Sequence, residues 1–506
     1  MKVLYIPIDE RPCNTTVVER IAQSGEDIEL CTVPRELLGY KKTPADNEDI
    51  WNWLNKEAIH ADAIILSIDM LIYGGLLPSR IHDLSWETAS KWIDRLRSLR
   101  QSYPNLPIYA SNLIMRTPKY SSSDEEPDYY EAWGKDIFLQ AYLEDKLKNS
   151  GISEEETQEL KAIKARLPKD HVEDYEQRRS FNLRINQHVL ELVHEGVITF
   201  LSIPQDDSAE YGYTALDQKV VINMREELQL YDNVHIYPGA DEVGATLLSR
   251  IFNDVRNERP SIFPIWSSTP GPGIIPMYED RPFQESMKAH ILAAGCQIAD
   301  HAESADLILA YNTPGQVMQE SWEQKNKDRT YSSFRHLPFF VDQIKQYLEK
   351  GKQVIIADSA YANGGDLELI RLLDRASLLD KLLSYKGWNT NCNTLGTTIA
   401  QGVIGRNGPV KSIKENIIYH LLDDYFYQAE VRMEMTENFI PNYGLNYFDL
   451  KDQANLVNEE RNKELYQRFK EEIRNSFTQM EIEKVSTFAP WNRMFEIGLE
   501  LETSTK

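Results

Sequence analysis

Residues 1–14 read MKVLYIPIDERPCN, and this stretch decides the class of fold. An apolar run from Val3 to Ile8 leads directly into the polar tetrapeptide Asp9–Pro12, unlike the end of a signal peptide. A short apolar run without polar alternation is typical of a parallel strand that is covered on both faces. The polar residues would then follow the carboxyl end of that strand, where α/β proteins bind their ligands.

The same pattern recurs along the chain. In the first half the further strand candidates are Ile28–Val33, Ala63–Ile68, Pro107–Leu113, Thr199–Ile203 and Val234–Tyr237. Helical patterns such as Trp86–Arg100 and Leu216–Gln229 lie between them. A second series begins near Pro260, with strand candidates Ile262–Trp266, Gln297–Ala299, Leu307–Tyr311, Val354–Ala357 and Leu382–Tyr385. This alternation predicts parallel sheets of the α/β class.

The 506 residues are too many for one ordinary core, so we expect several folding units. We predict an N-terminal α/β catalytic domain over 1–259, with a barrel-like or Rossmann-like parallel sheet. A charged, helix-favouring stretch predicts a helical insertion at about 126–195. A second α/β domain is expected over 260–410 and a mostly helical C-terminal region over 411–506. The tetrapeptide Asp9–Pro12 (DERP) resembles Glu279–Pro282 (EDRP). The similarity is either a trace of a duplication that produced the two halves of the chain or a coincidence.

The overall charge restricts the partners. The chain has 55 Lys and Arg against 79 Asp and Glu, for a net charge of −24. This balance argues against nucleic-acid and anionic-membrane partners, which need clustered cations. No apolar run approaches the ~20 residues of a membrane span. The cysteines form no CxxC pair, which favours free thiols in the cytoplasm: Cys13, Cys31, Cys296 and Cys392. Homo-oligomerisation stays open.

Acidic residues follow two of the predicted strands in adjacent pairs, and these are the candidate catalytic groups: Asp206, Asp207, Asp241 and Glu242. Two adjacent carboxylates repel one another, so one pKa rises and leaves a proton available for general-acid catalysis. Neighbours in an extended strand point to opposite faces, so a turn must bring Asp206 and Asp207 together. The alternative is one catalytic acid and one helix cap.

Polar and aromatic residues after the other strands are candidate substrate-binding groups: Asp9, Arg11, Asp69, Tyr73, Arg80, Asn112, Asn312, Asp358, Asn363, Trp388 and Asn389. Aromatic faces beside amides and carboxylates suit a sugar, whose C–H faces stack while its hydroxyls form hydrogen bonds. Individually these residues have simpler explanations, as helix caps, turns, core aromatics or a local Asp9–Arg11 ion pair. We expect Asp9, Asp69, Asp207 and Asp241 to converge on one hollow.

Motifs for other chemistries are missing from the sequence. There is no HExxH, no phosphate-binding GxxxxGK[ST] loop, no GxGxxG after the first strand and no GxSxG elbow. Cys13 lies in the first loop, but no histidine is paired with it in the sequence as a nucleophile would need. We therefore assign no metal ligands and require no cofactor, although the oxygen-rich loops leave a divalent cation open.

These motifs together resemble an uncharacterised bacterial family. They are Pro-x-Asp-x-Arg-Pro at Pro7–Pro12, Asp69 with Tyr-Gly-Gly, Gln-Asp-Asp-Ser at Gln205–Ser208, Pro-Gly-Ala-Asp-Glu at Pro238–Glu242 and Gly-Trp-Asn-Thr at Gly387–Thr390. The family is catalogued as domain-of-unknown-function family 4127, and the resemblance covers nearly the whole chain. It implies no established activity.

The leading functional prediction is a cytoplasmic glycoside hydrolase that cleaves a small glycoside or oligosaccharide with paired carboxylates. The Asp-Asp pair is loosely similar to that of substrate-assisted N-acetylhexosaminidases, in which the first acid orients and the second protonates. That similarity implies orientation by Asp206 and protonation by Asp207. The alternatives are a metal-dependent sugar isomerase, a metal-dependent amidohydrolase, and a sugar- or metabolite-binding protein without activity.

Overall fold

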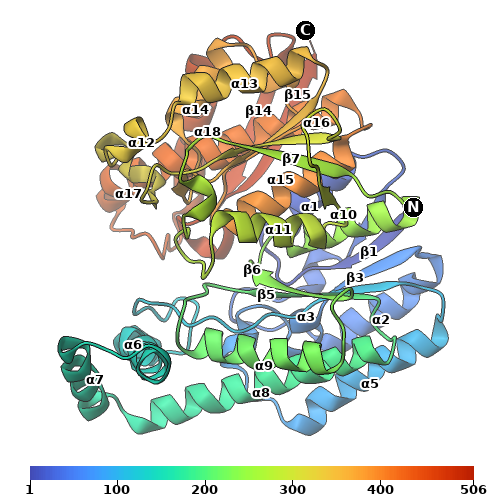
Figure 1. The fold of residues 1–506 in the computed structure, drawn as a ribbon, viewed down its shortest axis with the longest axis vertical. Coiled ribbons are helices and arrows are strands. Elements are labelled where there is room, and N and C mark those ends of the chain that lie inside the picture. The colour runs from blue at the N-terminus through green and yellow to red at the C-terminus, as the bar shows by residue number, and fades with distance from the viewer. Residues whose placement is uncertain (506) are drawn as a thin grey trace. The chain divides into compact units, whose positions relative to one another are not determined.

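The protein is described by a computed structural model over residues 1–505, and its chain forms two compact units (Figure 1). The first unit contains Met1–Glu10, Glu29–Gly244 and Tyr278–Asp280. The second contains Arg11–Ile28, Ala245–Met277 and the chain from Arg281 onward. No helix within residues 1–505 is long and apolar enough to cross a membrane.

This division differs from the predicted boundaries at 259 and 410. The first unit ends at Gly244, because most of helix α10 (Val243–Arg256) belongs to the second unit. The segment after 411 is part of the second unit and not a separate region, because helix α16 (Val410–His420) packs against that unit's sheet. The short segment Arg11–Ile28, with helix α1 (Thr16–Gln23), also belongs to the second unit.

The first unit contains a six-stranded parallel sheet with the order β2-β1-β3-β4-β5-β6. Its strands are β1 (Lys2–Ile6), β2 (Glu29–Thr32), β3 (Ala63–Ser67), β4 (Ile108–Ser111), β5 (Phe200–Gln205) and β6 (Val234–Pro238). Strands β3, β4 and β5 are buried at every residue, as the unbroken apolar runs predicted. The sheet is open, with β2 and β6 at its edges, so the Rossmann-like alternative holds and the barrel-like one is wrong.

Helices α2, α5, α8 and α9 lie on one face of this sheet (Figure 1). The helices of the first unit are α2 (Asn47–Glu57), α3 (Ile68–Tyr73), α4 (Pro78–Ile81), α5 (Trp86–Ser102), α6 (Tyr130–Asn149), α7 (Glu154–Arg166), α8 (Lys169–His194) and α9 (Tyr213–Glu227). The main core packs apolar side chains of the strands, such as Leu66 and Leu201, against Leu96 of α5 and Val189 of α8.

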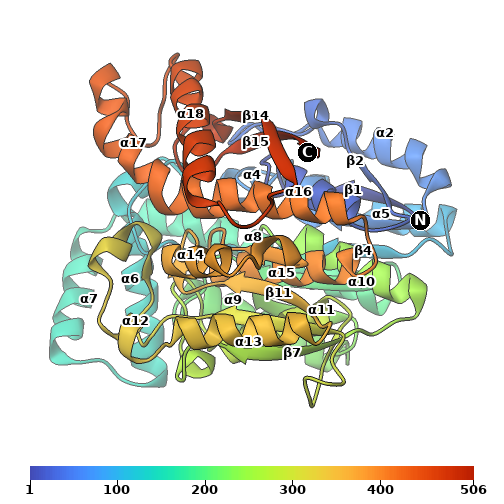
Figure 2. The same cartoon turned by 90° about the horizontal axis from the view of Figure 1, so that it is seen from above.

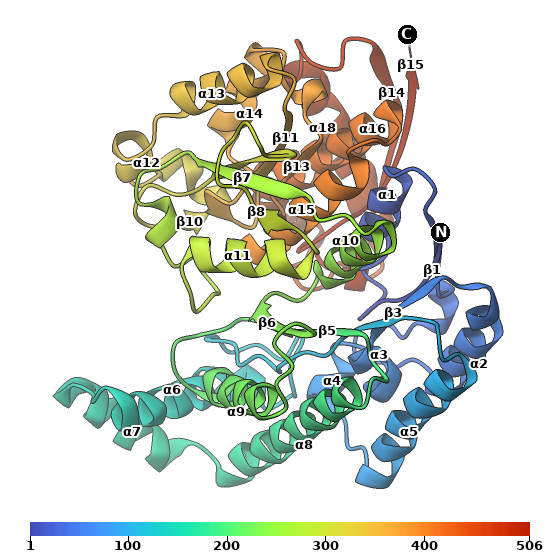
Figure 3. The ribbon, with the colours of Figure 1, turned by 45° about the vertical axis from the view of Figure 1, so that its right-hand side comes forward.

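The segment between β4 and β5 consists of α6, α7 and α8, where the sequence predicts a helical insertion. Figure 3 shows α6 and α7 at the N-terminal end of α8, beside the sheet. They share a small core that includes Tyr130, Ile137, Ile163 and Tyr175. Helix α8 continues from this core under the sheet, so the insertion is joined rigidly to the first unit.

The second unit contains a five-stranded parallel sheet with the order β13-β11-β9-β7-β8. Its strands are β7 (Ser261–Trp266), β8 (Gln297–Ile298), β9 (Leu307–Asn312), β11 (Gln353–Asp358) and β13 (Ser384–Lys386). Counted from its own first strand, this order repeats that of the first five strands of the other sheet. The two similar tetrapeptides each follow the first strand of a sheet, as duplicated halves would predict.

Helix α13 lies on one face of this sheet, and α11 and α15 lie on the other (Figure 3). The helices of the second unit after α10 are α11 (Phe283–Ala293), α12 (Thr330–Ser333), α13 (Leu337–Glu349), α14 (Leu367–Arg375), α15 (Asn391–Gly405), α16, α17 (Arg432–Asn438) and α18 (Ala454–Glu472). A π-helix, η6 (Leu421–Val431), joins α16 to α17. Two short strands, β10 (Gln319–Glu320) and β12 (Tyr361–Ala362), pair separately.

The chain ends in an antiparallel pair, β14 (Met480–Phe488) and β15 (Gly498–Thr505), where the sequence predicts mostly helices. Helix α18 packs against β14 (Figure 2). These strands carry many charged residues, such as Lys484, Glu500 and Glu502, and therefore lack the apolar run that marks the buried strands. Lys484 pairs with both glutamates across the two strands. Helices α16, η6, α17 and α18 make up about half of 411–506, and these two strands are the part of the region that the sequence pattern did not reveal.

Candidate active site

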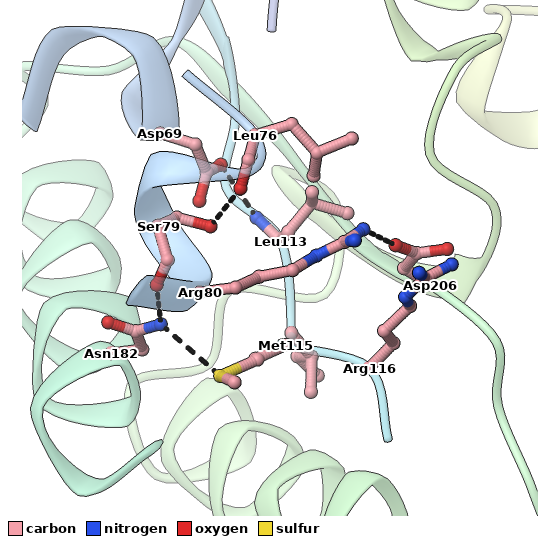
Figure 4. Close-up of a pocket in the computed structure, with 10 residues that line it drawn as sticks. Asp69, Leu76, Ser79, Arg80, Leu113, Met115, Arg116, Asn182 and Asp206 are labelled. Carbon is pink, nitrogen blue, oxygen red and sulfur yellow. Dashed lines mark hydrogen bonds and ion pairs between the residues drawn. The ribbon is translucent and has the colours of Figure 1, made fainter. Parts of the chain in front are cut away.

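Three neighbouring strands of the first sheet, β3, β4 and β5, end around one small cavity (Figure 4). The cavity has a volume of about 10 Å³, roughly the size of one water molecule. Its charged lining residues follow the three strands: Asp69, Arg80, Arg116 and Asp206. The carboxyl edge of the first sheet therefore brings together charged groups that are up to 137 residues apart in the chain.

Asp69 lies in the first turn of α3, directly after β3. The helix begins because the Ser67 side chain accepts a hydrogen bond from the Met70 amide at 3.2 Å. The Asp69 carboxyl group is only 3% exposed and accepts a hydrogen bond from the Leu113 amide at 3.0 Å. Burial raises its pKa from 3.8 to about 6, because these hydrogen bonds only partly replace the lost hydration.

Asp69→Asn should therefore change the pH dependence of stability. The folded pKa of Asp69 exceeds the unfolded one, so wild type loses stability as pH rises from about 4 to about 6. A shift of this size corresponds to about 3 kcal/mol. Asn does not titrate, so the variant does not lose this contribution. The difference in unfolding free energy, variant minus wild type, should therefore increase by about that amount from pH 3.5 to pH 7. Urea unfolding at both pH values measures it, with the exposed Asp232→Asn as the control; an unchanged difference would contradict the assignment.

Arg80, on α4, is the first centre of a buried ion-pair lattice. Its Nη1 contacts Glu125 Oε2 at 3.1 Å and Glu126 Oε1 at 3.2 Å. Its Nη2 contacts Asp206 Oδ2 at 2.6 Å. The arginine side chain is 2% exposed, so this charge is compensated entirely by neighbouring carboxylates.

Arg116, in the loop after β4, is the second centre of the lattice. Its Nε contacts Glu126 Oε1 and its Nη2 contacts Glu125 Oε2, each at 2.8 Å. Its Nη1 contacts Asp207 Oδ2 at 3.2 Å. Each arginine therefore binds both glutamates and one of the two aspartates. We call these six residues the Arg–carboxylate lattice: Arg80, Arg116, Glu125, Glu126, Asp206 and Asp207.

The Asp206–Asp207 pair reaches the lattice through a turn, as the sequence analysis required. Strand β5 ends at Gln205, and Asp207 has a φ of 42°, in the left-handed region that Asp tolerates better than most residues. Both carboxyl groups thereby face the arginines. Asp207 stays 20% exposed, and burial together with the neighbouring Asp206 raises its pKa to about 6 although Arg116 opposes this.

Glu125 and Glu126 connect the two arginines and were not predicted from the sequence. Glu126 is 1% exposed, its Oε1 accepts from both guanidinium groups, and its Oε2 has no hydrogen-bond partner among residues 1–505. A buried carboxylate oxygen without a partner costs about 1–3 kcal/mol or more. The adjacent acids 125–126 repeat the pattern of 206–207, but no predicted strand precedes them, so strand ends could not reveal them.

A polar stripe on α8 was missed as well. It consists of four residues spaced four, three and four positions apart: Tyr175, Arg179, Asn182 and Asn186. The Tyr175 hydroxyl and Arg179 Nη1 donate to the Arg116 carbonyl oxygen at 2.9 and 3.0 Å. The stripe therefore fixes the backbone that carries the second arginine of the lattice.

The other end of the stripe holds the loops after β3 and β4. Asn182 Nδ2 donates to the Ser79 carbonyl at 2.8 Å, and Asn186 Nδ2 donates to Asn112 Oδ1 at 2.7 Å. Polar side chains at helical spacing on a buried face are the signal that would have identified them. Helix α8 thus supports the candidate site.

The other predicted residues of the first unit lie mainly inside the framework. Asn112 joins Asp69 to Asn186 and is buried. The ring of Tyr73 lies 4.8 Å from that of His82, and its buried hydroxyl has no hydrogen-bond partner within residues 1–505. Asp9 and Asp241 follow β1 and β6 of the same sheet and are also buried.

Glu242, a predicted catalytic residue, is buried within its own loop. It is 0% exposed, and its Oε2 accepts a hydrogen bond from the Ala240 amide at 2.9 Å. Its carboxylate lies against Gly239, where a Cβ would come within 2.1 Å of Oε1. The side chain therefore closes its own loop, and a catalytic role for it stays a prediction.

The remaining predicted residues belong to the second unit. Arg11 pairs with Glu496 at 3.3 Å and lies over the Trp491 ring, 4.7 Å from its centre. Asn312 Nδ2 donates to Asp358 Oδ1 at 2.7 Å, and both residues are buried. Asp358 also accepts from the Tyr385 hydroxyl at 3.0 Å, while burial raises its pKa to about 7. Asn312 and Asp358 are thus part of an internal hydrogen-bond network, and a role for them in substrate binding stays a prediction.

Asn363, Trp388 and Asn389 lie together in the second unit. The Asn363 amide donates to the Asn389 carbonyl at 2.9 Å, and both residues have positive φ, at 56° and 61°. Trp388 and Asn389 are partly exposed. A role for them in sugar binding stays a prediction. Across residues 1–505, no group of three or more His, Cys, Asp and Glu side chains is arranged to hold a metal ion.

The fold and the site define an α/β protein of two units. Each unit has an open parallel sheet with the same order of its first five strands, and a charged site lies at the carboxyl edge of the first unit's sheet. The chain belongs to the family described as protein of unknown function (DUF4127), which it matches over residues 3–500. The resemblance predicted from the sequence motifs is thereby confirmed. No curated protein matches the chain.

Proposed function

We propose that the protein is a glycoside hydrolase that acts on a small glycoside or oligosaccharide. Asp207 is the general acid and Asp206 is the second carboxylate. The observation that carries the proposal is the different environment of these adjacent groups. Asp206 is bound tightly by Arg80 at 2.6 Å, whereas Asp207 is partly exposed with a pKa of about 6. Paired carboxyl groups in different environments are typical of acid and base partners.

The chemistry divides between the two aspartates. Asp207 would donate its proton to the glycosidic oxygen as the bond to the anomeric carbon breaks, so the leaving group departs as a free alcohol and the oxygen of a water molecule takes its place on the anomeric carbon. Asp206 lines the water-sized cavity. As the second carboxylate it would act at the anomeric carbon, either as the nucleophile or as the base that activates the attacking water. The lattice holds four carboxyl groups against two arginines, and this excess of negative charge favours the positive charge that develops on the sugar ring.

A panel of nitrophenyl glycosides, assayed with and without EDTA, tests this function. We expect at least one glycoside to release nitrophenol at an unchanged rate in EDTA, because side chains of the chain carry out the chemistry. Nitrophenol release that EDTA abolishes and Mn²⁺ or Mg²⁺ restores would overturn the metal-free mechanism. A panel without nitrophenol release, together with metal-dependent conversion of a free sugar or hydrolysis of an amide, would replace the proposal with a metal-dependent isomerase or amidohydrolase. Sugars that raise the melting temperature without any turnover would indicate a binding protein.

A further inference from the structure

The two halves of the Arg–carboxylate lattice are not equivalent. Arg80 makes its shortest contact, 2.6 Å, to Asp206. Arg116 makes its shortest contacts, both 2.8 Å, to the two glutamates and a longer one of 3.2 Å to Asp207. The charge of Arg116 is therefore shared mainly with the glutamates, and Asp207 receives the smallest part of it.

We propose that Arg116 and Glu125 are positioning residues that act in opposite directions on the Asp207 carboxyl group. Arg116 favours the carboxylate form through its direct contact. Glu125 favours the protonated form, because it draws the shared guanidinium toward itself and adds negative charge nearby. The inference rests on the proposed function, since it explains how Asp207 keeps the proton that a general acid must donate.

Other charged and titratable groups near Asp207 come from several segments. Asp206 adjoins it on the same turn, Arg80 faces it from α4, and Tyr120 lies near it in the loop after β4. Burial and Asp206 raise the pKa of Asp207, whereas Arg116 and Arg80 lower it. Glu125 raises it, so Arg116 and Glu125 have opposite effects although they touch each other. If the two residues only held the loop in place, substituting them would not shift the pKa of Asp207 in opposite directions.

The direct test is titration of the Asp207 carboxyl group by ¹³C NMR, with the signal assigned by its loss in Asp207→Asn. Arg116→Gln should raise the midpoint by about one pH unit, because an opposite charge at this distance is removed. Glu125→Gln should lower it by roughly half as much, because Glu125 acts partly through the shared arginine. Arg116→Lys keeps a single charge and should give a smaller rise, which also covers the case in which Arg116→Gln does not fold.

Two exposed residues of the same unit provide matched controls. Arg166→Gln removes an arginine that pairs with Asp136 outside the lattice, and Glu155→Gln removes an exposed acid of α7. Neither should move the Asp207 midpoint. Equal shifts in the controls, or shifts of the same sign in the Arg116 and Glu125 variants, would overturn the inference.

Activity measurements separate this inference from the proposed function. If Asp207 is the acid, the basic limb of the kcat/KM profile should follow the NMR midpoint in each variant. Opposite NMR shifts in a protein that hydrolyses no glycoside would support the charge arrangement and reject the glycosidase. Hydrolysis whose profile stays fixed while the midpoint moves would reject Asp207 as the acid.

Discussion

Asp207→Asn should lower kcat/KM about a thousandfold on a glycoside with a poor leaving group, such as an alkyl glycoside. Proton donation by a placed carboxyl group contributes about 10²- to 10⁴-fold to such reactions, and Asn cannot supply the proton. The loss should be much smaller on a dinitrophenyl glycoside, whose leaving group needs little protonation. Steady-state kinetics on both substrates measure the difference.

Two further results complete this test. The variant should fold as wild type does, because Asp207 is partly exposed and Asn also tolerates its positive φ. Its stability relative to wild type should rise with pH, as for Asp69→Asn, because the folded pKa of Asp207 is also raised. The exposed Asp232→Asn provides the matched control and should keep full activity. Near-normal turnover of the alkyl glycoside by the Asp207 variant would exclude this residue as the acid.

Arg80→Met should destabilise the protein by about 3–5 kcal/mol, the largest stability effect that we expect. The substitution leaves the buried Glu126 with one of its two arginines and removes the arginine that contacts the partly buried Asp206, and an unpaired buried charge costs that much. Adding Glu126→Gln should recover part of the loss, because it removes one of the uncompensated charges. Urea unfolding of the single and double variants measures both quantities.

The exposed arginine Arg166 serves as the comparison. Its ion pair with Asp136 lies at the surface, so Arg166→Met should cost less than about 1 kcal/mol. A similar small loss for Arg80→Met would show that the lattice does not hold the loops of the first unit together. If the double variant loses more unfolding free energy than the two single variants lose together, the assigned charge balance is contradicted.

Most strands could be predicted because parallel sheets bury both faces of a strand. Phe200–Gln205 and Leu307–Asn312 are buried throughout, and each appears in the sequence as a short apolar run. The final pair of strands was missed because Met480–Phe488 is largely exposed and carries charged residues on its surface. Charged surface strands lack the apolar signal on which the prediction depends.

The site was predicted only where a strand end marked it. Asp69 and Asp206 follow β3 and β5, so the rule for parallel sheets selected them. Glu126 and Arg179 follow no strand, yet they hold the arginines and their backbone in place. Conversely, Glu242 follows β6 but folds back on its own loop, which strand order cannot reveal.

By itself the sequence determined the α/β class, the parallel strands and the presence of acids at their carboxyl ends, because these depend on local hydrophobic pattern. Only the tertiary structure decided which acids meet which arginines. Arg80, Glu126 and Asp206 lie far apart in the chain and interact because three strands end side by side. The strength of a charge pair depends on distance and burial, and neither is encoded by local spacing.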